Sequence, residues 1–504
     1  MMERKAIVIG SGLGGLQCAY ILAKHGMEVI VLEKAAQIGG CLQTFRRRDS
    51  GGVFHTFDTG FHYAGGLDEG QSLYPLFKYF GLMDLPWKRL DDDCFDEVVF
   101  ADGDNVSRYP MASGHKHFSE RLAEFFPHQK TGLEEYAGFL RKVGDNIFRA
   151  FSPESGMNDL FSVPAYGFLE RTIADPLLRR VLSGSSLKME LARDSLPLYV
   201  FAQINNSFIQ SAWRLGPSGV KGAPEGGAMI ASRLARSVES MGGRVMTRSE
   251  VTRILTDGND RVLGVEVSGP DGAISEMRAD IVVSDAHPAV TVGLVEHCKA
   301  FRNIYRTRIS GLRNSRGMFT ANIALKSGTL PYLNRNLFVH KSGADLWAPA
   351  NNRTDSVMVH FYVPEGGAAE TLDLLSPMSL DADWKNFPEE KREEIRAVKL
   401  EECISLASKA LPGLDKSVDS VWTSTPATWE HFTGSPGGSA YGVAGDCRNP
   451  MSTVLSPRTP LAGLYMTGQS LNLHGMLGVS MTSILTCGAI LGMDMLVNEL
   501  SINE

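Results

Sequence analysis

The chain has 504 residues, of which 43% are hydrophobic and 21% are charged, and this composition excludes a disordered or fibrous protein. A chain of this length is expected to form two or three domains around a sizeable core. Its 50 basic and 57 acidic side chains give a net charge of -7, which argues against a nucleic-acid binder with a basic face.

The first predicted elements form a strand–helix–strand unit that binds a nucleotide. An apolar run at 6–9 meets the pattern Gly10-x-Gly12-x-x-Gly15, and an amphipathic helix then leads to a second strand over Glu28–Leu32. Gly10 permits the tight turn, Gly12 lets the backbone approach a pyrophosphate, and Gly15 allows the helix to pack closely on the strand. The helix N-terminus, with its unpaired N–H groups, is expected to receive the phosphates.

Three residues beyond this unit extend the predicted nucleotide site. Glu33 directly follows the second strand, where a carboxylate accepts hydrogen bonds from ribose hydroxyls. Gly39 and Gly40 come shortly afterwards and permit a second close approach of the backbone to the same ligand.

Two longer motifs give the chain a family resemblance. Residues 33–45 read E-K-x-x-x-x-G-G-C-x-x-T-F, and residues 57–63 read F-D-T-G-x-H-Y. With them the sequence resembles the FAD-dependent phytoene desaturase superfamily, particularly its branch of carotenoid isomerases and all-trans-retinol 13,14-reductases. Further similar segments follow in the family's order, at 224–245, 424–442 and 464–488.

The resemblance implies an α/β fold with a Rossmann-like FAD/NAD(P)-binding domain of the discontinuous GR2 type and a mixed α+β substrate domain. The FAD-binding domain is expected to comprise 1–70, 215–290 and 415–504, and the substrate-binding domain 71–214 and 291–414. The only dinucleotide fingerprint lies at the start of the chain, so no second nucleotide domain is expected.

FAD is the cofactor that the motifs and the resemblance together imply. The expected cofactor-binding residues are Gly10, Gly12, Gly14, Gly15, Glu33, Lys34, Gly39, Gly40, Cys41, Thr44, Gly60, Val251, Gly468, Gln469, Ser470, Gly475, Leu477, Gly478 and Val479.

The glycine-rich strip near the end of the chain is expected to close against the flavin. By resemblance, a strand ends at Gly468, and a helix after the turn points its N-terminus at the flavin ring. Peptide N–H groups there would stabilise negative charge on reduced flavin. The family usually has an acidic residue where Ser470 stands. The alternatives for this strip are a buried helix packed by small residues and, over Gly478–Val497, a membrane span.

Two histidines, His62 and His474, lie inside the family motifs and are the candidate catalytic residues. Their alternative role is structural, since an isolated histidine often only satisfies local hydrogen bonds. The aromatic-rich segment Leu133–Leu169 could line an apolar tunnel or contact a membrane, or could form ordinary core helices.

The leading hypothesis for function is a flavoenzyme that transfers hydride to or from an apolar polyene or isoprenoid-like substrate. Its electron donor or acceptor is left open among NADPH, a quinone and oxygen. The alternatives are an FAD-free escort protein similar to the GDP-dissociation inhibitors, and an enzyme similar to the amine oxidases.

Seven cysteines without a C-x-x-C pair predict a reducing compartment and no metal site. The apolar run at 6–9 is too short for a signal peptide. We therefore expect a cytoplasmic protein and leave peripheral contact with a membrane open.

Overall fold

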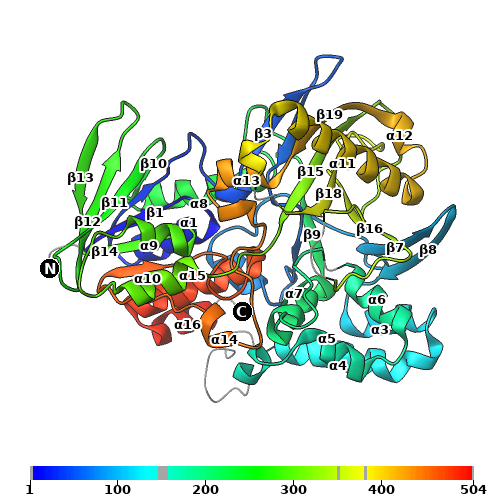
Figure 1. Cartoon of the computed structure of the whole chain (residues 1–504), viewed down its shortest axis with the longest axis horizontal. Coiled ribbons are helices and arrows are strands. Elements are labelled where there is room, and N and C mark those ends of the chain that lie inside the picture. The colour runs from blue at the N-terminus through cyan, green and yellow to red at the C-terminus, as the bar shows by residue number, and fades with distance from the viewer. Residues whose placement is uncertain (1–3, 146–156, 186, 349–351, 380–382, 502–504) are drawn as a thin grey trace.

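A computed structural model describes residues 4–145, 157–185, 187–348, 352–379 and 383–501 of the chain. Figure 1 shows two lobes side by side, one built around a parallel sheet and the other around a larger mixed sheet. Segments from the beginning, the middle and the end of the chain meet in the first lobe.

The first lobe contains a five-stranded parallel sheet. Its strand order is β10 (Arg244–Met246), β2 (Glu28–Leu32), β1 (Lys5–Ile9), β14 (Ile281–Ser284) and β20 (Leu464–Met466). Every neighbouring pair is parallel. Parallel sheets are usually covered on both faces, which explains why these strands are almost continuously apolar.

The two faces of this sheet belong to different parts of the core. In β1, Ala6 and Val8 pack with helices α1 (Leu13–Lys24), α8 (Gly227–Ser240) and α15 (Gly475–Leu491). Ile7 and Ile9 point to the opposite face, because successive side chains of a strand alternate. Covering that face are helices α9 (Pro288–Leu294) and α10 (Asn303–Ser310) and the antiparallel strands β11 (Glu250–Thr256), β12 (Val262–Ser268) and β13 (Ile274–Arg278).

The second lobe contains a seven-stranded sheet. Its order is β19 (Val418–Ser424), β15 (Gly317–Leu325), β18 (Thr371–Met378), β17 (Ser356–Phe361), β16 (Asn336–Lys341), β7 (Asp96–Asp102) and β8 (Asn105–Met111). Only the β16–β7 pair is parallel. One face packs against α11 (Glu389–Ala410), and Phe338, Met358 and Leu375 on the other face belong to the same buried cluster as Ala6 and Val8 of β1.

Shorter elements connect these sheets. The small sheets are formed by β3 (Thr44–Arg48) with β4 (Phe54–Asp58), and by β5 (Ala64–Gly65), β9 (Ala212–Leu215) and β6 (Trp87–Arg89). The remaining α-helices are α2 (Tyr74–Tyr79), α3 (His115–Ala123), α4 (Lys130–Gly144), α5 (Ala165–Thr172), α6 (Pro176–Gly184), α7 (Leu198–Gln210), α12 (Leu414–Ser417), α13 (Pro426–Thr433), α14 (Pro450–Thr453) and α16 (Met493–Ser501). The 3₁₀ turns are Gly40–Leu42, Pro127–Gln129, Met157–Phe161, Trp384–Asn386 and Pro436–Gly438.

The division into two domains at the predicted boundaries stays a prediction. The described parts of 291–414 include the antiparallel strands β15 to β18, with no parallel nucleotide-binding unit among them. The range 415–504 contains β19, which pairs with β15 of the larger sheet, as well as β20 of the parallel sheet.

The strip Gly478–Val497, for which a membrane span is the alternative, does not form one continuous helix. Helix α15 ends at Leu491, and α16 starts at Met493 after Gly492, whose φ of 113° lies in the left-handed region. None of the helices in the described part of the chain combines the length and the hydropathy that crossing a bilayer requires. Of the segment Leu133–Leu169, the described ends contribute buried residues from α4 and α5 to the core, while 146–156 lie outside the described residues.

Candidate functional site

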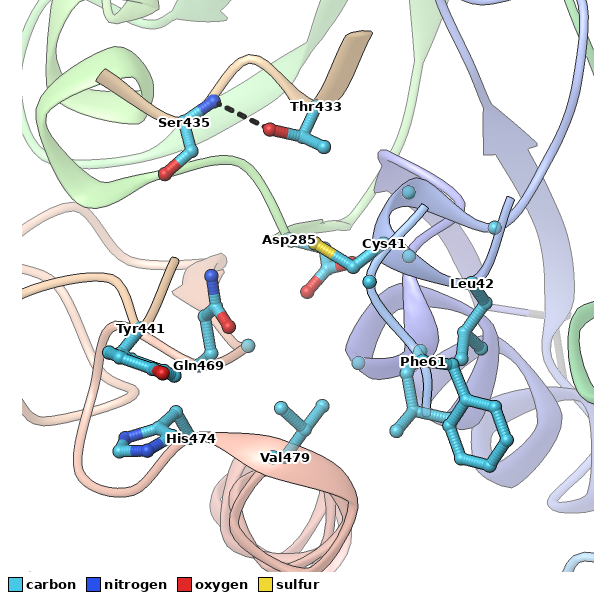
Figure 2. Close-up of a pocket in the computed structure, with 18 of the residues that line it drawn as sticks. Cys41, Leu42, Phe61, Asp285, Thr433, Ser435, Tyr441, Gln469, His474 and Val479 are labelled. Carbon is cyan, nitrogen blue, oxygen red and sulfur yellow. Dashed lines mark hydrogen bonds between the residues drawn. The ribbon is translucent and has the colours of Figure 1, made fainter. Parts of the chain in front are cut away.

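A cavity of about 490 Å³ lies at the carboxyl edge of the parallel sheet. The residue directly after each of four strands lines it: Gly10 after β1, Glu33 after β2, Asp285 after β14 and Thr467 after β20. Ligands of open α/β sheets bind outside the carboxyl ends of the strands, so this is where a nucleotide is expected. In Figure 2, Tyr441 and His474 lie together across the cavity from Cys41, Leu42 and Phe61.

The glycine turn at the start of the chain has the close packing that a pyrophosphate site requires. Gly10 has a φ of 92°, in the region that favours glycine. A Cβ atom on Gly15 would lie 2.2 Å from the carbonyl oxygen of Gly10, so only glycine lets α1 pack this closely on the turn. Gly12 forms an isolated parallel bridge with Gly39, which brings the two predicted glycine segments together.

The carboxylate of Glu33 lines the cavity beside the glycine turn. It is 7% exposed and accepts hydrogen bonds from the backbone N–H and the hydroxyl of Ser11, at 2.9 and 2.6 Å. Its other oxygen accepts from the backbone N–H of Ala35 at 2.8 Å. The carboxylate is therefore held rigidly at the cavity wall.

Most of the predicted cofactor residues line the cavity, and three lie behind its wall. Those that line it are Gly10, Gly12, Gly14, Glu33, Lys34, Gly39, Gly40, Cys41, Gly60, Val251, Gly468, Gln469, Ser470, Gly475, Leu477 and Val479. Of the others, Gly15 supports the turn, Thr44 begins β3, and Gly478 allows close packing because its Cβ would lie 2.4 Å from the Leu473 backbone. Their roles in cofactor binding stay predictions.

The C-terminal strip presents a helix N-terminus to the cavity. Gly475, Met476, Leu477 and Val479 from the first turns of α15 line it. Among the described residues, no side chain caps the N-terminus of α15. Its backbone N–H groups and the positive end of its dipole are therefore available to an electron-rich ligand.

The two candidate catalytic histidines both line the cavity but have different surroundings. His62 lies with its Nε2 atom 3.6 Å from Asp373 and its ring 5.1 Å from that of His360. His474 donates from Nε2 to the carbonyl oxygen of Lys188 at 2.9 Å, and burial lowers its pKa to about 4. His474 is thus neutral near pH 7 with its proton engaged, which favours the structural role for this residue.

Asp285 is a residue at this site that the sequence analysis missed. Its carboxyl group faces the N-terminus of α1, since Cβ atoms on Gly12 and Gly14 would lie 2.3 and 2.6 Å from its oxygens. Burial raises the pKa of Asp285 to about 7, against the effect of backbone hydrogen bonds from Gly15 and Gly12. The available signal was the position of Asp285, directly after a parallel strand on the edge where β1 also ends.

The raised pKa of Asp285 predicts a pH dependence of stability. In the unfolded chain this carboxyl ionises near its ordinary pKa of 3.8, whereas the folded protein holds the proton up to about pH 7. The stability contributed by the protonated carboxyl is therefore lost as the pH rises from 4 to 7. By linkage, the wild type should lose on the order of 4 kcal/mol relative to Asp285→Asn over this interval.

Urea unfolding of the apoprotein at several pH values measures this difference. The matched control is Asp271→Asn in an exposed turn. The free energy of unfolding of this variant should change with pH in the same way as that of the wild type. A free-energy difference between Asp285→Asn and wild type that stays constant from pH 4 to 7 would show that Asp285 is ionised in the fold.

The residues of the cavity fit FAD. The carboxyl group of Asp285 lies at the α1 N-terminus, the place where a phosphate is bound in dinucleotide folds. Gly12 and Gly40 let two backbone segments meet at the cavity, since a Cβ on Gly40 would lie 3.3 Å from the Gly12 Cα. In the described ranges, no group of three or more His, Cys, Asp or Glu side chains could hold a metal ion.

Comparisons with known proteins support this fold. The model of the NAD(P)-binding Rossmann-like domain matches residues 8–80. The chain is 26% identical to the all-trans-retinol 13,14-reductase of Danio rerio, over 96% of the chain and 85% of the relative. It is 26% identical to prolycopene isomerase 1 of an Oncidium hybrid cultivar, over 93% and 80%. It is 24% identical to the neurosporene-forming phytoene desaturase of Cereibacter sphaeroides, over 87% and 85%.

Solved structures share the fold. An oxidoreductase from Methanosarcina mazei aligns with a TM-score of 0.60 at 18% identity, over 95% of this chain and 99% of that one. Putrescine oxidase aligns with a TM-score of 0.60 at 15% identity, over 99% of both chains. The predicted fold class and the resemblance to the phytoene desaturase superfamily are therefore confirmed.

Proposed function

We propose that the protein is an FAD-dependent oxidoreductase that acts on carbon–carbon bonds of an apolar polyene or isoprenoid-like substrate. The observation that carries the proposal is one continuous cavity with two chemically different ends. Its first end is the glycine turn and Glu33, and its second end is lined by apolar side chains together with Tyr63 and Lys188. The apolar side chains are Leu73, Ile204, Phe208, Met358 and Leu375.

The relatives agree with this class of reaction. Their names describe a reductase, an isomerase and a desaturase of polyenes, so the expectation of an oxidoreductase is confirmed at that level. The similarity to putrescine oxidase concerns the fold alone, and an amine-oxidase activity gains no support from the apolar end of the cavity. The escort hypothesis is disfavoured because the fixed carboxylate of Glu33 lines the cavity beside the glycine turn, where a ribose of FAD would bind.

Each part of the chain has a separate task in this proposal. The N-terminus of α1 would hold the pyrophosphate and Glu33 a ribose, while the N-terminus of α15, which lines the cavity, would stabilise charge on the flavin. Bound FAD supplies or accepts the hydride. The apolar end excludes water and aligns the substrate. A cytoplasmic location stays a prediction.

The test is incubation of the FAD-loaded protein with all-trans-retinol and longer polyenes under reducing and oxidising conditions. We expect a product that has gained or lost two hydrogens, together with a change in the flavin spectrum. Turnover of amines with peroxide release, in the absence of any polyene product, would contradict the proposal and favour the amine-oxidase alternative.

A further inference from the structure

A buried ion pair lies in the wall of the cavity. Lys188 lines the cavity, and its Nζ atom is 3.2 Å from Oδ2 of Asp96 at the start of β7. The side chains are 8% and 0% exposed. A buried ion pair is seldom more stabilising than apolar side chains of similar size. The position of this pair beside an apolar ligand site therefore indicates a role in the reaction rather than in stability.

Asp96 is fixed by neutral partners as well. Its Oδ2 atom accepts from the hydroxyl of Tyr63 at 2.9 Å, and its Oδ1 atom accepts from the amide of Asn336 at 2.9 Å. Arg214 donates in turn to the Asn336 side-chain oxygen at 3.2 Å. These bonds leave Asp96 little freedom, so it holds the Lys188 ammonium in one position.

The ammonium group of Lys188 also contacts the part of the cavity that would hold substrate. Its Nζ atom lies 4.2 Å from the centre of the Phe208 ring, and Phe208 and Tyr63 line the same cavity. An ammonium has three N–H donors, and the bond to Asp96 uses one of them. A proton can therefore leave Lys188 while the contact with Asp96 is kept.

The proposed function requires such a proton. Saturating a carbon–carbon double bond needs a hydride at one carbon and a proton at the next, and desaturation reverses both transfers. The proton donor must lie at the apolar end of the cavity, where water is excluded.

Three other titratable groups that line the cavity, Tyr63, Tyr441 and His474, are less suited to give up a proton. Burial and Asp96 raise the pKa of Tyr63 well above its ordinary value, and burial raises the pKa of Tyr441. His474 directs its proton at the backbone of Lys188. In contrast, burial lowers the pKa of Lys188, partly offset by Asp96, so its ammonium is a stronger acid than an exposed lysine.

We propose that Lys188 is the catalytic acid–base residue for the carbon next to the one that exchanges hydride. This inference rests on the proposed function. In saturation, the electron pair of the double bond forms a C–H bond with a Lys188 proton, and the N–H electron pair stays on Nζ. The neighbouring carbon would take a hydride from reduced FAD, and Lys188 would regain a proton from solvent once the product has left the cavity. In desaturation, the neutral amine takes a proton from one carbon, the freed C–H electron pair forms the double bond, and the hydride of the neighbouring carbon would pass to oxidised FAD.

Two substitutions of Lys188 test this role in the holoenzyme. Lys188→Arg keeps a positive charge beside Asp96 but holds its proton, and Lys188→Met removes the proton donor. We expect each to lower the turnover of all-trans-retinol about 100- to 10 000-fold, the usual contribution of acid–base catalysis, while KM changes only a few-fold. If Lys188→Met fails to fold, the double variant with Asp96→Asn removes both buried charges.

The matched control is Lys399→Met. Lys399 is also a buried lysine, 4% exposed, whose Nζ atom donates to the carbonyl oxygens of Asn352 and Pro377 on the far side of the larger sheet. Burial lowers its pKa as well. Its loss should reduce stability without changing the turnover of retinol.

A second readout does not depend on turnover. In protein with ¹³C-labelled lysine, NMR titration should find a Lys188 pKa below that of exposed lysines, with the signal identified by its absence in Lys188→Arg.

A Lys188 pKa at or above the ordinary range would overturn the inference. So would wild-type turnover in both Lys188 variants, and this result would leave the proposed function intact. An FAD-loaded wild type that neither saturates nor desaturates any polyene would overturn both.

Discussion

Replacing Gly15 with alanine is expected to abolish FAD binding and to lower the free energy of unfolding by about 3 kcal/mol, as overpacking of a close contact does. The new Cβ atom would lie 2.2 Å from the carbonyl oxygen of Gly10. The position of the Cβ atom is set by the backbone and its partner is a backbone oxygen, so no side chain can rotate away to relieve the clash. Helix α1 would have to move off the turn, and its N-terminus would no longer face the phosphates. Urea unfolding and the flavin content of the purified variant measure the two effects.

Gly138→Ala is the matched control for this substitution. Gly138 lies at an exposed position inside α4, where a Cβ atom would meet no atom within 4 Å. Alanine should stabilise this helix by about 0.5 to 1 kcal/mol and leave the flavin content unchanged. Normal flavin content in Gly15→Ala would mean that the close contact at the turn is not needed for cofactor binding.

Replacing Glu33 with glutamine is expected to weaken FAD binding about 10- to 100-fold, because a hydrogen bond to a charged group contributes about 1.5–3 kcal/mol. The amide keeps the shape of the side chain but is neutral. It would therefore accept weaker hydrogen bonds from both ribose hydroxyls. It also weakens the bonds to Ser11 that hold the glycine turn. Titration of the apoprotein with FAD, followed by flavin fluorescence, gives the dissociation constant.

Glu28→Gln is the control on the same strand. Glu28 lies at the opposite end of β2, at the surface, where it forms an ion pair with Lys5 at 3.1 Å. Its loss should leave the affinity for FAD unchanged. Equal dissociation constants for Glu33→Gln and wild type would remove Glu33 from the ribose site.

The parallel unit could be predicted in detail because its signals are local. The predicted strand Glu28–Leu32 is β2 with the same bounds, and β1 differs from the predicted run at 6–9 by one residue. The glycine spacing predicts the turn, since Gly10 has a positive φ and a Cβ atom on Gly15 would clash with the Gly10 carbonyl oxygen five residues away. The resemblance also predicts a helix in the C-terminal strip, and the N-terminus of α15 lines the cavity.

The acid–base network at the other end of the cavity could not be predicted in this way. Lys188 and Asp96 are 92 positions apart and come from different elements. Neither stands in a motif, and a lone lysine or aspartate is normally a surface residue. Only the fold brings them together. Asp285 is an intermediate case, because its place after a parallel strand was visible but its partners across the turn were not.

The visible absorption spectrum of the purified protein, followed by heat release and identification of the chromophore, tests the central claim most directly. We predict the spectrum of a bound flavin, and the released compound should be FAD. A colourless protein that also binds no added FAD would contradict the assignment of an FAD-dependent oxidoreductase and would favour the escort alternative.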